Sequence, residues 1–269
     1  MADNRTTDAN HGLVLRAGDA VLVVDAAAGG RMASLRIGDL ELIHGQGAAP
    51  FHWGCFPMVP YTGRLPHGRF THDGRSYSLP LAMPPHAMHG TTYDRPWQVA
   101  APDRLTVDLG PDWPFRGRAE QHLALTPDSL TATLSVESDG DGFPAAVGWH
   151  PWFPTRLARG GPARLGFSAE AMYVRDEAFA VDGRLTVPTP PPWDDSFVGA
   201  TQPVTVLWPE ALRLNLTADT DHWVVYNRLP HAFCVEPISG PPDALNRAPR
   251  LVTPDQPLSL RMTLAWQRL

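Results

Sequence analysis

Two residues of this sequence combine an acid–base side chain with an apolar setting. Glu236 follows the apolar residues 232–235 and precedes a proline, and His150 lies within the aromatic segment 147–153. A carboxylate at the end of a buried strand is unfavourable unless it is paired or faces a ligand, and partial burial raises its pKa toward the range of a general base. A functional role is therefore favoured for Glu236. For His150 alone, a core position is the better interpretation.

Two charged residues stand beside apolar or proline-rich runs. Arg64 ends the run 54–63, and a guanidinium offers several donors in a fixed fork that suits ligand hydroxyls. A surface arginine whose stem packs on apolar atoms explains this segment equally well. Asp194 belongs to the pair Asp194-Asp195 near prolines, a pattern that is typical of a solvated turn.

His86 and His89 are spaced i, i+3 after two prolines, and Gly90 follows them. Such a pair could bind a metal, form hydrogen bonds with a ligand or belong to a plain loop, and the segment alone favours the loop. A metal site needs a third protein ligand at diagnostic spacing, and none is evident for these histidines or for His150. The sequence therefore predicts no metal.

The composition excludes several classes of enzyme. The 269 residues include no lysine, so all 22 basic residues are arginine. Schiff-base aldolases, pyridoxal-phosphate enzymes, P-loop hydrolases and ordinary kinases each need a specific lysine amine. The formal net charge of −6 argues against a nucleic-acid partner, and no basic run indicates binding to a membrane surface.

The N-terminal residues and the two cysteines indicate the compartment. Residues 1–12 are polar and lack the apolar region of a secretory signal, and no run of about 18 apolar residues could span a membrane. Cys55 and Cys234 are too few for a disulfide framework. We expect a cytoplasmic protein, either a monomer or a homodimer.

Alternating apolar and polar residues recur along the chain and predict half-buried strands. The longest alternating runs are 130–137, 212–217 and 258–267, and shorter strand-like runs lie at 20–24, 105–109 and 167–174. A period of two with one apolar face is typical of antiparallel sheets.

Turn signals separate these runs, and no segment has a capped helical period over ten or more residues. The signals are Asp73-Gly74, the acidic-glycine run 139–142 and Asp182-Gly183. Many strands without intervening helices predict an all-β fold, a large antiparallel β-sandwich. The proline-rich stretch 188–192 is a rigid loop rather than a linker, so we expect one domain over residues 1–269.

Taken in order, these segments resemble the aldose 1-epimerase (galactose mutarotase) family from about Gly29 to the C-terminus. Each fragment alone is weakly specific, but five in the family's order on a strand-rich chain are strongly specific. The matching motifs are Pro60-Tyr61-x-x-Arg64 with Gly68-Arg69-Phe70, His89-Gly90, Gly148-x-His150-Pro151-x-Phe153, Asp194-x-x-Phe197, and Cys234-Val235-Glu236-Pro237 followed by residues 240–246.

The resemblance implies a galactose mutarotase-like supersandwich and a sugar substrate. In that family the matching histidine and glutamate are the acid–base pair, which points to His150 and Glu236. Arg64, His89 and Asp194 match positions that hold the sugar. Trp152 or Phe153 could form an apolar wall against the sugar ring.

The resemblance also implies a reaction that needs no cofactor. Opening a cyclic hemiacetal requires removal of a proton from the C1 hydroxyl and delivery of one to the ring oxygen. Glu236 would be the base and protonated His150 the acid, and they would exchange roles when the open aldehyde closes on its other face. No redox step or phosphoryl transfer arises, so no cofactor is expected.

Departures from the family pattern leave the sugar open. Gly63 stands where asparagine is usual, Trp152 where tyrosine is common, and residues 91–95 are unusual. The nearest alternative is a hexose-6-phosphate mutarotase, for which Arg95 is the candidate phosphate contact. A non-catalytic carbohydrate-binding β-sandwich and a β-sandwich glycoside hydrolase are more distant alternatives.

Overall fold

The computed structural model describes residues 12–45, 47 and 49–269. Within those residues, no helix has both the length and the apolar character needed to cross a membrane. The N-terminal residues 1–11, on which the expected lack of a secretory signal rests, lie outside this described part.

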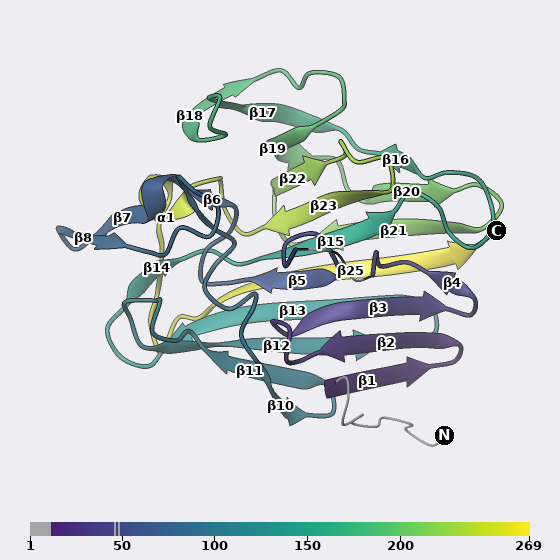
Figure 1. Ribbon diagram of the computed structural model, residues 1–269, viewed down its shortest axis with the longest axis horizontal. Helices are drawn as coiled ribbons and strands as arrows, with labels where there is room; N and C mark the ends of the chain where they lie inside the picture. Colours follow the sequence, from purple (N-terminus) through teal and green to yellow (C-terminus); the bar gives the residue numbers. More distant parts are fainter. Residues whose placement is uncertain (1–11, 46, 48) are drawn as a thin grey trace.

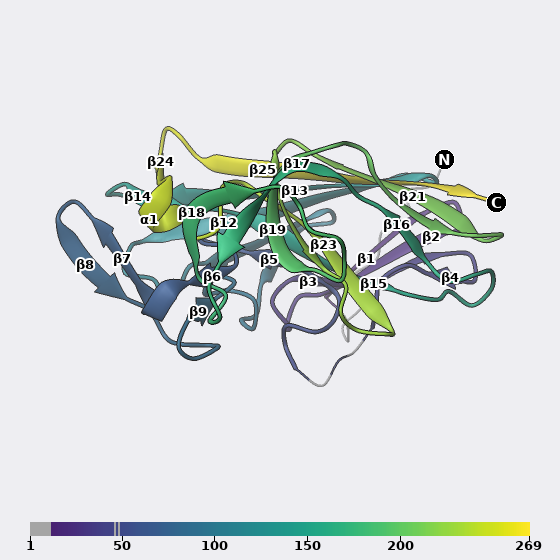
Figure 2. The same cartoon turned by 90° about the horizontal axis from the view of Figure 1, so that it is seen from above.

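Two large antiparallel sheets pack face to face, as the view from above shows (Figure 1, Figure 2). The strands run in the order β1-β2-β3-β5-β15-β23-β22-β19-β17-β18 in the larger sheet, where β4 pairs with β3, and β10-β11-β12-β13-β25-β21-β20-β16 in the smaller sheet. The larger sheet contains β1 (Gly12–Ala17), β2 (Ala20–Asp25), β3 (Arg31–Ile37), β4 (Leu40–Glu41), β5 (Cys55–Met58), β15 (Gly148–Pro154), β17 (Ala169–Arg175), β18 (Val181–Thr186), β19 (Asp194–Ala200), β22 (His222–Tyr226) and β23 (Ala232–Ile238). The smaller sheet contains β10 (Gln98–Ala101), β11 (Arg104–Asp108), β12 (Gly117–Leu125), β13 (Ser129–Ser138), β16 (Arg164–Gly166), β20 (Val204–Trp208), β21 (Leu212–Ala218) and β25 (Leu258–Arg268). The expected all-β antiparallel sandwich is therefore confirmed.

The predicted alternation sets the packing between the sheets. Along β13, Leu130, Ala132, Leu134 and Val136 are fully buried, whereas the polar residues between them are partly exposed. The apolar faces of β21 and β25 join the same core cluster, together with apolar residues of the larger sheet. Burial of one apolar face per strand is the main driving force for this two-layer arrangement.

Two strands at the centre of the larger sheet are buried on both faces. In β15 and β23, Trp149, Phe153 and Val235 pack into the core between the sheets. The alternating pleat turns His150 and Glu236 to the opposite face. The outer face of these two strands is therefore the place where polar side chains are buried.

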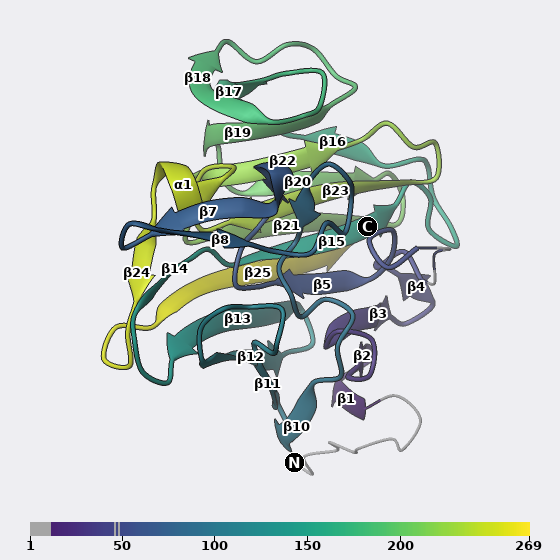
Figure 3. The same ribbon diagram turned by 60° about the vertical axis from the view of Figure 1, so that its left-hand side comes forward.

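Short paired strands and one helix gather at one end of the sandwich, where they come forward in the rotated view (Figure 3). These elements are β6 (Arg64–Leu65) with β9 (Ala87–Met88), β7 (Arg69–His72) with β8 (Arg75–Ser78), β14 (Phe143–Ala145) with β24 (Arg250–Val252), the 3-10 turn η1 (Pro66–Gly68) and α1 (Ala244–Arg247). They carry Arg64 and Met88 toward the outer face of the larger sheet.

One predicted turn is wrong. Asp182-Gly183 lies inside β18, and the chain reverses earlier, over residues 176–180. The carboxylate of Asp176 accepts the backbone N–H of Ala180 at 2.9 Å and so fixes the turn at that point. The signals at 73–74 and 139–142 do lie between strands.

Candidate active site

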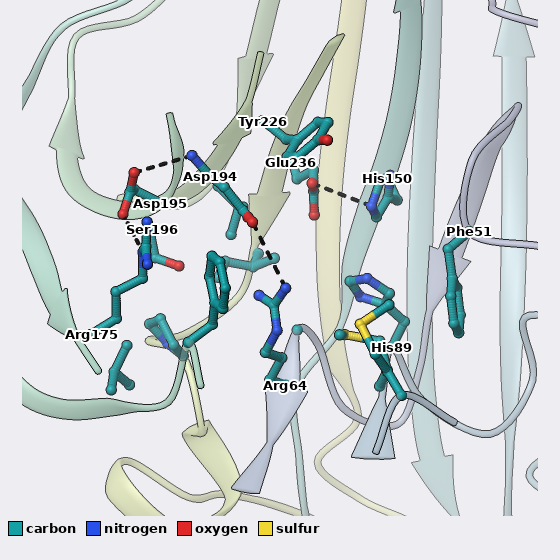
Figure 4. Close-up of a pocket in the computed structure, with 18 of the residues that line it drawn as sticks. Phe51, Arg64, His89, His150, Arg175, Asp194, Asp195, Ser196, Tyr226 and Glu236 are labelled. Atoms are coloured by element: carbon teal, nitrogen blue, oxygen red, sulfur yellow. Dashed lines mark hydrogen bonds and ion pairs between the residues drawn. The ribbon is translucent and has the colours of Figure 1, made fainter. Parts of the chain in front are cut away.

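A cavity opens on the outer face of the larger sheet, and the five residues that the family resemblance assigned to the site line it (Figure 4). These residues are Arg64, His89, His150, Asp194 and Glu236. They come from β6, the segment after β9, β15, β19 and β23, so only the folded sheet brings them together.

His150 and Glu236 face each other across neighbouring strands. The antiparallel register pairs Gly148 with Ile238 and Trp152 with Cys234, which sets His150 opposite Glu236. The Nε2 atom of His150 lies 3.3 Å from Oε1 of Glu236, and their side chains are only 7% and 4% exposed. The structure thus contains a close, desolvated imidazole–carboxyl pair at the inner end of the cavity.

Aromatic rings hold His150 in place. Phe56 stacks on its imidazole at a centroid distance of 4.5 Å and an angle of 18°, and Trp152 stacks at 5.6 Å. His89 meets the same ring edge-on at 4.9 Å. The indole N–H of Trp152 donates to the carbonyl of Phe51 at 2.7 Å, which joins this cluster to the segment before β5.

Burial acts on the two members of the pair in opposite directions. Desolvation is the main cause that lowers the pKa of His150 to about 3, with the nearby Arg31 and His52 acting in the same direction and a backbone hydrogen bond opposing them. Desolvation raises the pKa of Glu236 well above its ordinary value, and the neighbouring Asp194 adds to this effect. The sugar-free site therefore favours a protonated Glu236 beside an uncharged His150, because a low dielectric disfavours both charged forms.

This result alters one expectation from the sequence, which is that His150 starts as the protonated partner. A protonated carboxyl with a neutral imidazole contains the same number of protons as a carboxylate with an imidazolium. The two states differ only in the position of one proton across the 3.3 Å contact.

His89 is also uncharged in this environment. Desolvation, followed by the proximity of His150 and Arg64, lowers its pKa well below the usual value. Its backbone has a φ of 56°, and its N–H donates to the carbonyl of Gly63 at 2.9 Å. The following Gly90 has a φ of 87°, and a Cβ atom there would lie 2.1 Å from the carbonyl oxygen of Val59. Only glycine fits that close approach, so the backbone geometry explains the His-Gly pair.

Arg64 and Asp194 form a looser pair on the wall of the cavity. The Nη2 atom of Arg64 lies 3.9 Å from Oδ2 of Asp194, and the side chains are 27% and 17% exposed. The guanidinium also lies over the ring of Phe179 at 4.7 Å. Asp194 is therefore not the solvated turn residue that its segment alone indicated, because β19 holds it at the cavity.

The sequence did not single out a second such pair. Nε of Arg175 donates to Oδ1 of Asp195 at 2.6 Å, and the guanidinium lies 4.2 Å from the centroid of Phe179. All three residues line the cavity. The adjacency of Asp195 to Asp194 and the position of Arg175 at the end of a predicted strand were the available signals.

Arg31, another residue that the sequence did not single out, organises the opposite wall. It is 1% exposed, and its guanidinium lies 4.1 Å from the ring centroid of Trp53 and 5.0 Å from that of Phe56. Its acceptors are the carbonyl oxygens of Ala28 at 2.7 Å, Pro50 at 2.8 Å, Trp53 at 2.9 Å and Tyr93 at 3.1 Å. These bonds fix the segment that supplies Phe51 and His52 to the cavity.

The structure also places three further candidates from the sequence. Arg95 does not line the cavity, and its Nη1 donates instead to the carbonyl of Asp108 at 2.9 Å. Nε2 of His86 is engaged by the carbonyl of Ala178 at 2.8 Å, so His86 and His89 do not act as a pair. Trp152 forms the apolar wall, whereas Phe153 packs into the core between the sheets.

One group within the described residues could hold a metal ion. Ligand atoms of His150, Cys234 and Glu236 all lie within 4.8 Å of one another, and all three residues are buried. The sequence alone indicated no complete set of metal ligands that includes His150. In the structure, Cys234 and Glu236, which are spaced i, i+2 on β23, complete a set of three with it. Cys234 packs against Trp152 across the neighbouring strand, and its burial raises the pKa of the thiol well above the ordinary value, which disfavours the thiolate that a metal requires.

Comparison with known proteins relates this site to a family. The family model described as aldose 1-epimerase matches residues 12–259. A protein of Escherichia coli K12, named YphB and described as uncharacterized, is 26% identical over 222 residues, which cover 72% of this chain and 75% of that protein.

Solved structures share the fold. A galactose mutarotase-like protein from Clostridium acetobutylicum superposes with a TM-score of 0.83 at 15% identity, covering 96% of this chain and 95% of the other. A galactose 1-epimerase from Lactobacillus acidophilus NCFM gives a TM-score of 0.76 at 14% identity, with 95% and 94% covered. From the match over residues 12–259, the chain belongs to the aldose 1-epimerase family.

Proposed function

We propose that this protein is an isomerase that interconverts the α and β anomers of a free aldose by opening and closing the sugar ring. The observation that carries the proposal is the 3.3 Å contact between His150 and Glu236 inside a cavity. A buried pair of titratable groups is costly to maintain, and such pairs are concentrated at sites of proton transfer. Family membership supports the same reaction class.

The mechanism follows from the proton that the pair shares. Glu236 is the base that takes the proton of the C1 hydroxyl, and His150 is the acid that protonates the ring oxygen. Moving the shared proton from Glu236 to His150 changes no net charge and prepares base and acid together. After rotation about the C1–C2 bond, the two residues exchange roles and the ring closes on its other face. Each group contributes roughly 10²–10⁴-fold to the rate.

The remaining residues hold the sugar. Arg64 and His89 provide nitrogen donors, and Asp194 provides an acceptor at the cavity wall. Trp152 offers an apolar surface to the C–H face of the ring. None of these roles requires a cofactor or a metal, and the enzyme is proposed to act in the cytoplasm as a single-domain monomer or homodimer.

A free sugar is preferred to a phosphorylated one because the charges of the cavity are balanced. Arg64 and Arg175 face Asp194 and Asp195, and each arginine is paired with one aspartate. A phosphate site is expected instead to present cationic groups whose charge no neighbouring carboxylate offsets. Arg95, the candidate phosphate contact, lies outside the cavity lining.

The test is anomer-exchange NMR or polarimetry over a panel of free aldoses and their 6-phosphates, corrected for spontaneous mutarotation. Catalysed exchange of at least one free aldose is expected, with Glu236→Gln as the inactive control. Binding of sugars without faster exchange would instead identify a carbohydrate-binding module. Faster exchange of the 6-phosphates than of the free sugars would contradict the preferred substrate class.

A further inference from the structure

The cavity extends beyond the residues proposed for chemistry. The close-up view shows Arg64 and Asp194 between two other pairs, with His150 and Glu236 on one side and Arg175 and Asp195 on the other (Figure 4). All of these residues line the same cavity. A sugar whose C1 lies at the His150–Glu236 pair and whose ring passes Arg64 and Asp194 directs its far end toward Arg175.

Arg175 is positioned to bind a ligand rather than merely to neutralise a carboxylate. Its Nε donates to Oδ1 of Asp195 at 2.6 Å, and Oδ2 of Asp195 accepts the backbone N–H of Asp194 at 3.1 Å. These bonds hold one edge of the guanidinium. Among the residues that the structure describes, its two Nη groups make no hydrogen bond or ion pair, and the side chain is 24% exposed. A fixed guanidinium with free donors suits neighbouring oxygen atoms of a ligand.

Phe179 supports both arginines from a strained backbone position. Its φ is 64°, which is unusual for a bulky residue, and its ring lies 4.2 Å from the Arg175 guanidinium and 4.7 Å from that of Arg64. Such strain persists only where surrounding contacts impose it, and it is concentrated at ligand sites.

Contacts on three sides impose this conformation. The N–H of Phe179 donates to the carbonyl of Asp176 at 3.1 Å within the turn. His86 meets the carbonyl of Ala178 at 2.8 Å, and Arg247 donates to the carbonyl of Val181 at 2.5 Å. The tip of the β17–β18 hairpin is thus fastened to the β8–β9 connection and to α1, and it holds the Phe179 ring at the cavity.

The charge of this region indicates the ligand chemistry. Asp195 offsets the charge of Arg175, so the pair presents donors and acceptors without a net positive charge. This combination suits neutral hydroxyl groups, which both donate and accept hydrogen bonds, better than a phosphate or carboxylate.

We infer that Arg175, Asp195 and Phe179 form a distal subsite that binds the hydroxyl groups of the sugar remote from C1 and so selects aldoses that carry them. The inference rests on the proposed function for its orientation of the sugar, because C1 must lie at the His150–Glu236 pair. Arg175 is a specificity-determining residue, and it takes no part in proton transfer.

The main test compares the best sugar of the panel with its 4-deoxy and 6-deoxy analogues. In the wild-type protein, at least one analogue is expected to lose about tenfold or more in kcat/KM. Arg175→Met is expected to raise KM for the parent sugar by about tenfold or more, with kcat within a few-fold, and to remove the preference over that analogue. The matched control is Arg213→Met, because Arg213 is an exposed arginine on β21 of the other sheet.

A second variant separates binding from folding. Phe179→Gly removes the ring but accepts the positive φ without strain, so the melting temperature should be retained or rise while KM increases. Wild-type KM and selectivity in both folded variants would overturn the subsite. A fall in kcat at unchanged KM would also overturn it, because that pattern denotes a role in the chemical step.

Calorimetric binding of the same sugars keeps this inference distinguishable from the proposed function. If the wild type catalyses no exchange yet binds the parent sugar more tightly than an analogue, and Arg175→Met abolishes that difference, the proposed function fails and the subsite stands. If exchange is catalysed and the wild type does not discriminate the analogues, the subsite fails and the proposed function stands.

Discussion

The centre of the larger sheet and its outer hairpin build the cavity in different ways. At the centre, β15 and β23 are buried on both faces, and regular strand register sets His150 opposite Glu236. At the hairpin, β18 is exposed along most of its length, and Phe179 is held in a strained turn by contacts from several elements. The proposed acid–base pair thus lies on the most deeply buried part of the larger sheet. The proposed recognition residues lie near its margin, where sequence changes disturb packing least.

Replacing the central pair should produce the largest effect. Glu236→Gln retains the shape of the side chain and removes the base, so kcat should fall by about 10²–10⁴-fold while sugar binding survives. His150→Asn should act in the same way. The measurement is the initial rate of mutarotation against sugar concentration, with circular dichroism to verify folding. Near-normal kcat in folded Glu236→Gln would make Glu236 a structural carboxyl group.

Replacing the residues of the cavity wall should mainly weaken binding. Arg64→Ala and Asp194→Ala each remove a proposed charged hydrogen-bonding partner of the sugar, a loss of roughly 1.5–3 kcal/mol, or about 10–150-fold in KM. The same kinetic assay with calorimetric binding separates this from a loss of kcat. A large fall in kcat at unchanged KM would instead assign Arg64 or Asp194 to the chemical step. Chemistry and recognition would then not be divided between the two regions.

The pH dependence of activity should report the central pair. The rate needs one proton on the pair, so kcat/KM should be bell-shaped, falling when a second proton binds and when the shared proton is lost. Because burial lowers the pKa of His150 to about 3, the acid limb of the sugar-free enzyme should lie far below the ordinary histidine range. Rates measured from pH 4 to 10 test this. An acid limb near pH 6.5, or a rate still rising steadily above about pH 9, would contradict the assignment.

The free energy of unfolding should depend on pH in the directions that the shifted pKa values of His150, His89 and Glu236 require. The lowered pKa values of His150 and His89 contribute stability that is present above about pH 6.5 and is lost as the pH falls. The raised pKa of Glu236 contributes stability that is present below about pH 4.5 and is lost as the pH rises through its folded value. Urea unfolding at several pH values measures both slopes, and Glu236→Gln should remove the alkaline one. An unchanged alkaline slope in that variant would show that other groups cause it.

Removing metal ions should produce the smallest effect. We expect full activity after treatment with EDTA and dialysis, because the proposed proton transfers need only His150 and Glu236. Metal analysis of the purified protein accompanies the assay. Loss of activity that added zinc or manganese restores would instead assign His150, Cys234 and Glu236 as a metal site.

The sequence predicted the centre of the molecule better than the hairpin for physical reasons. Alternation along residues 130–137 and 258–267 identified β13 and β25, because burial of one face leaves a period of two in the sequence. The order of the motifs likewise identified the five candidate residues that the cavity brings together.

Arg175, Phe179 and Arg31 escaped prediction because their roles depend on contacts between segments distant in sequence. Arg31 donates to carbonyl oxygens of the segment 50–53 and of Tyr93, and no pattern in the sequence near Arg31 predicts those acceptors. The Asp182-Gly183 signal was misleading because the carboxylate of Asp176 fixes the turn earlier in the chain, over residues 176–180.

The two cysteines of the chain occupy the strands on either side of the one that carries His150. Cys55 lies on β5 and Cys234 on β23, both are free and fully buried, and burial raises the pKa of each thiol. A thiol reagent can therefore modify them only when the packing around the strands beside His150 transiently opens. With no other cysteine to give background, the rate of labelling measures how often the centre of the sheet opens. The two thiols thus provide an internal measure of how often the structure opens around the proposed acid–base pair.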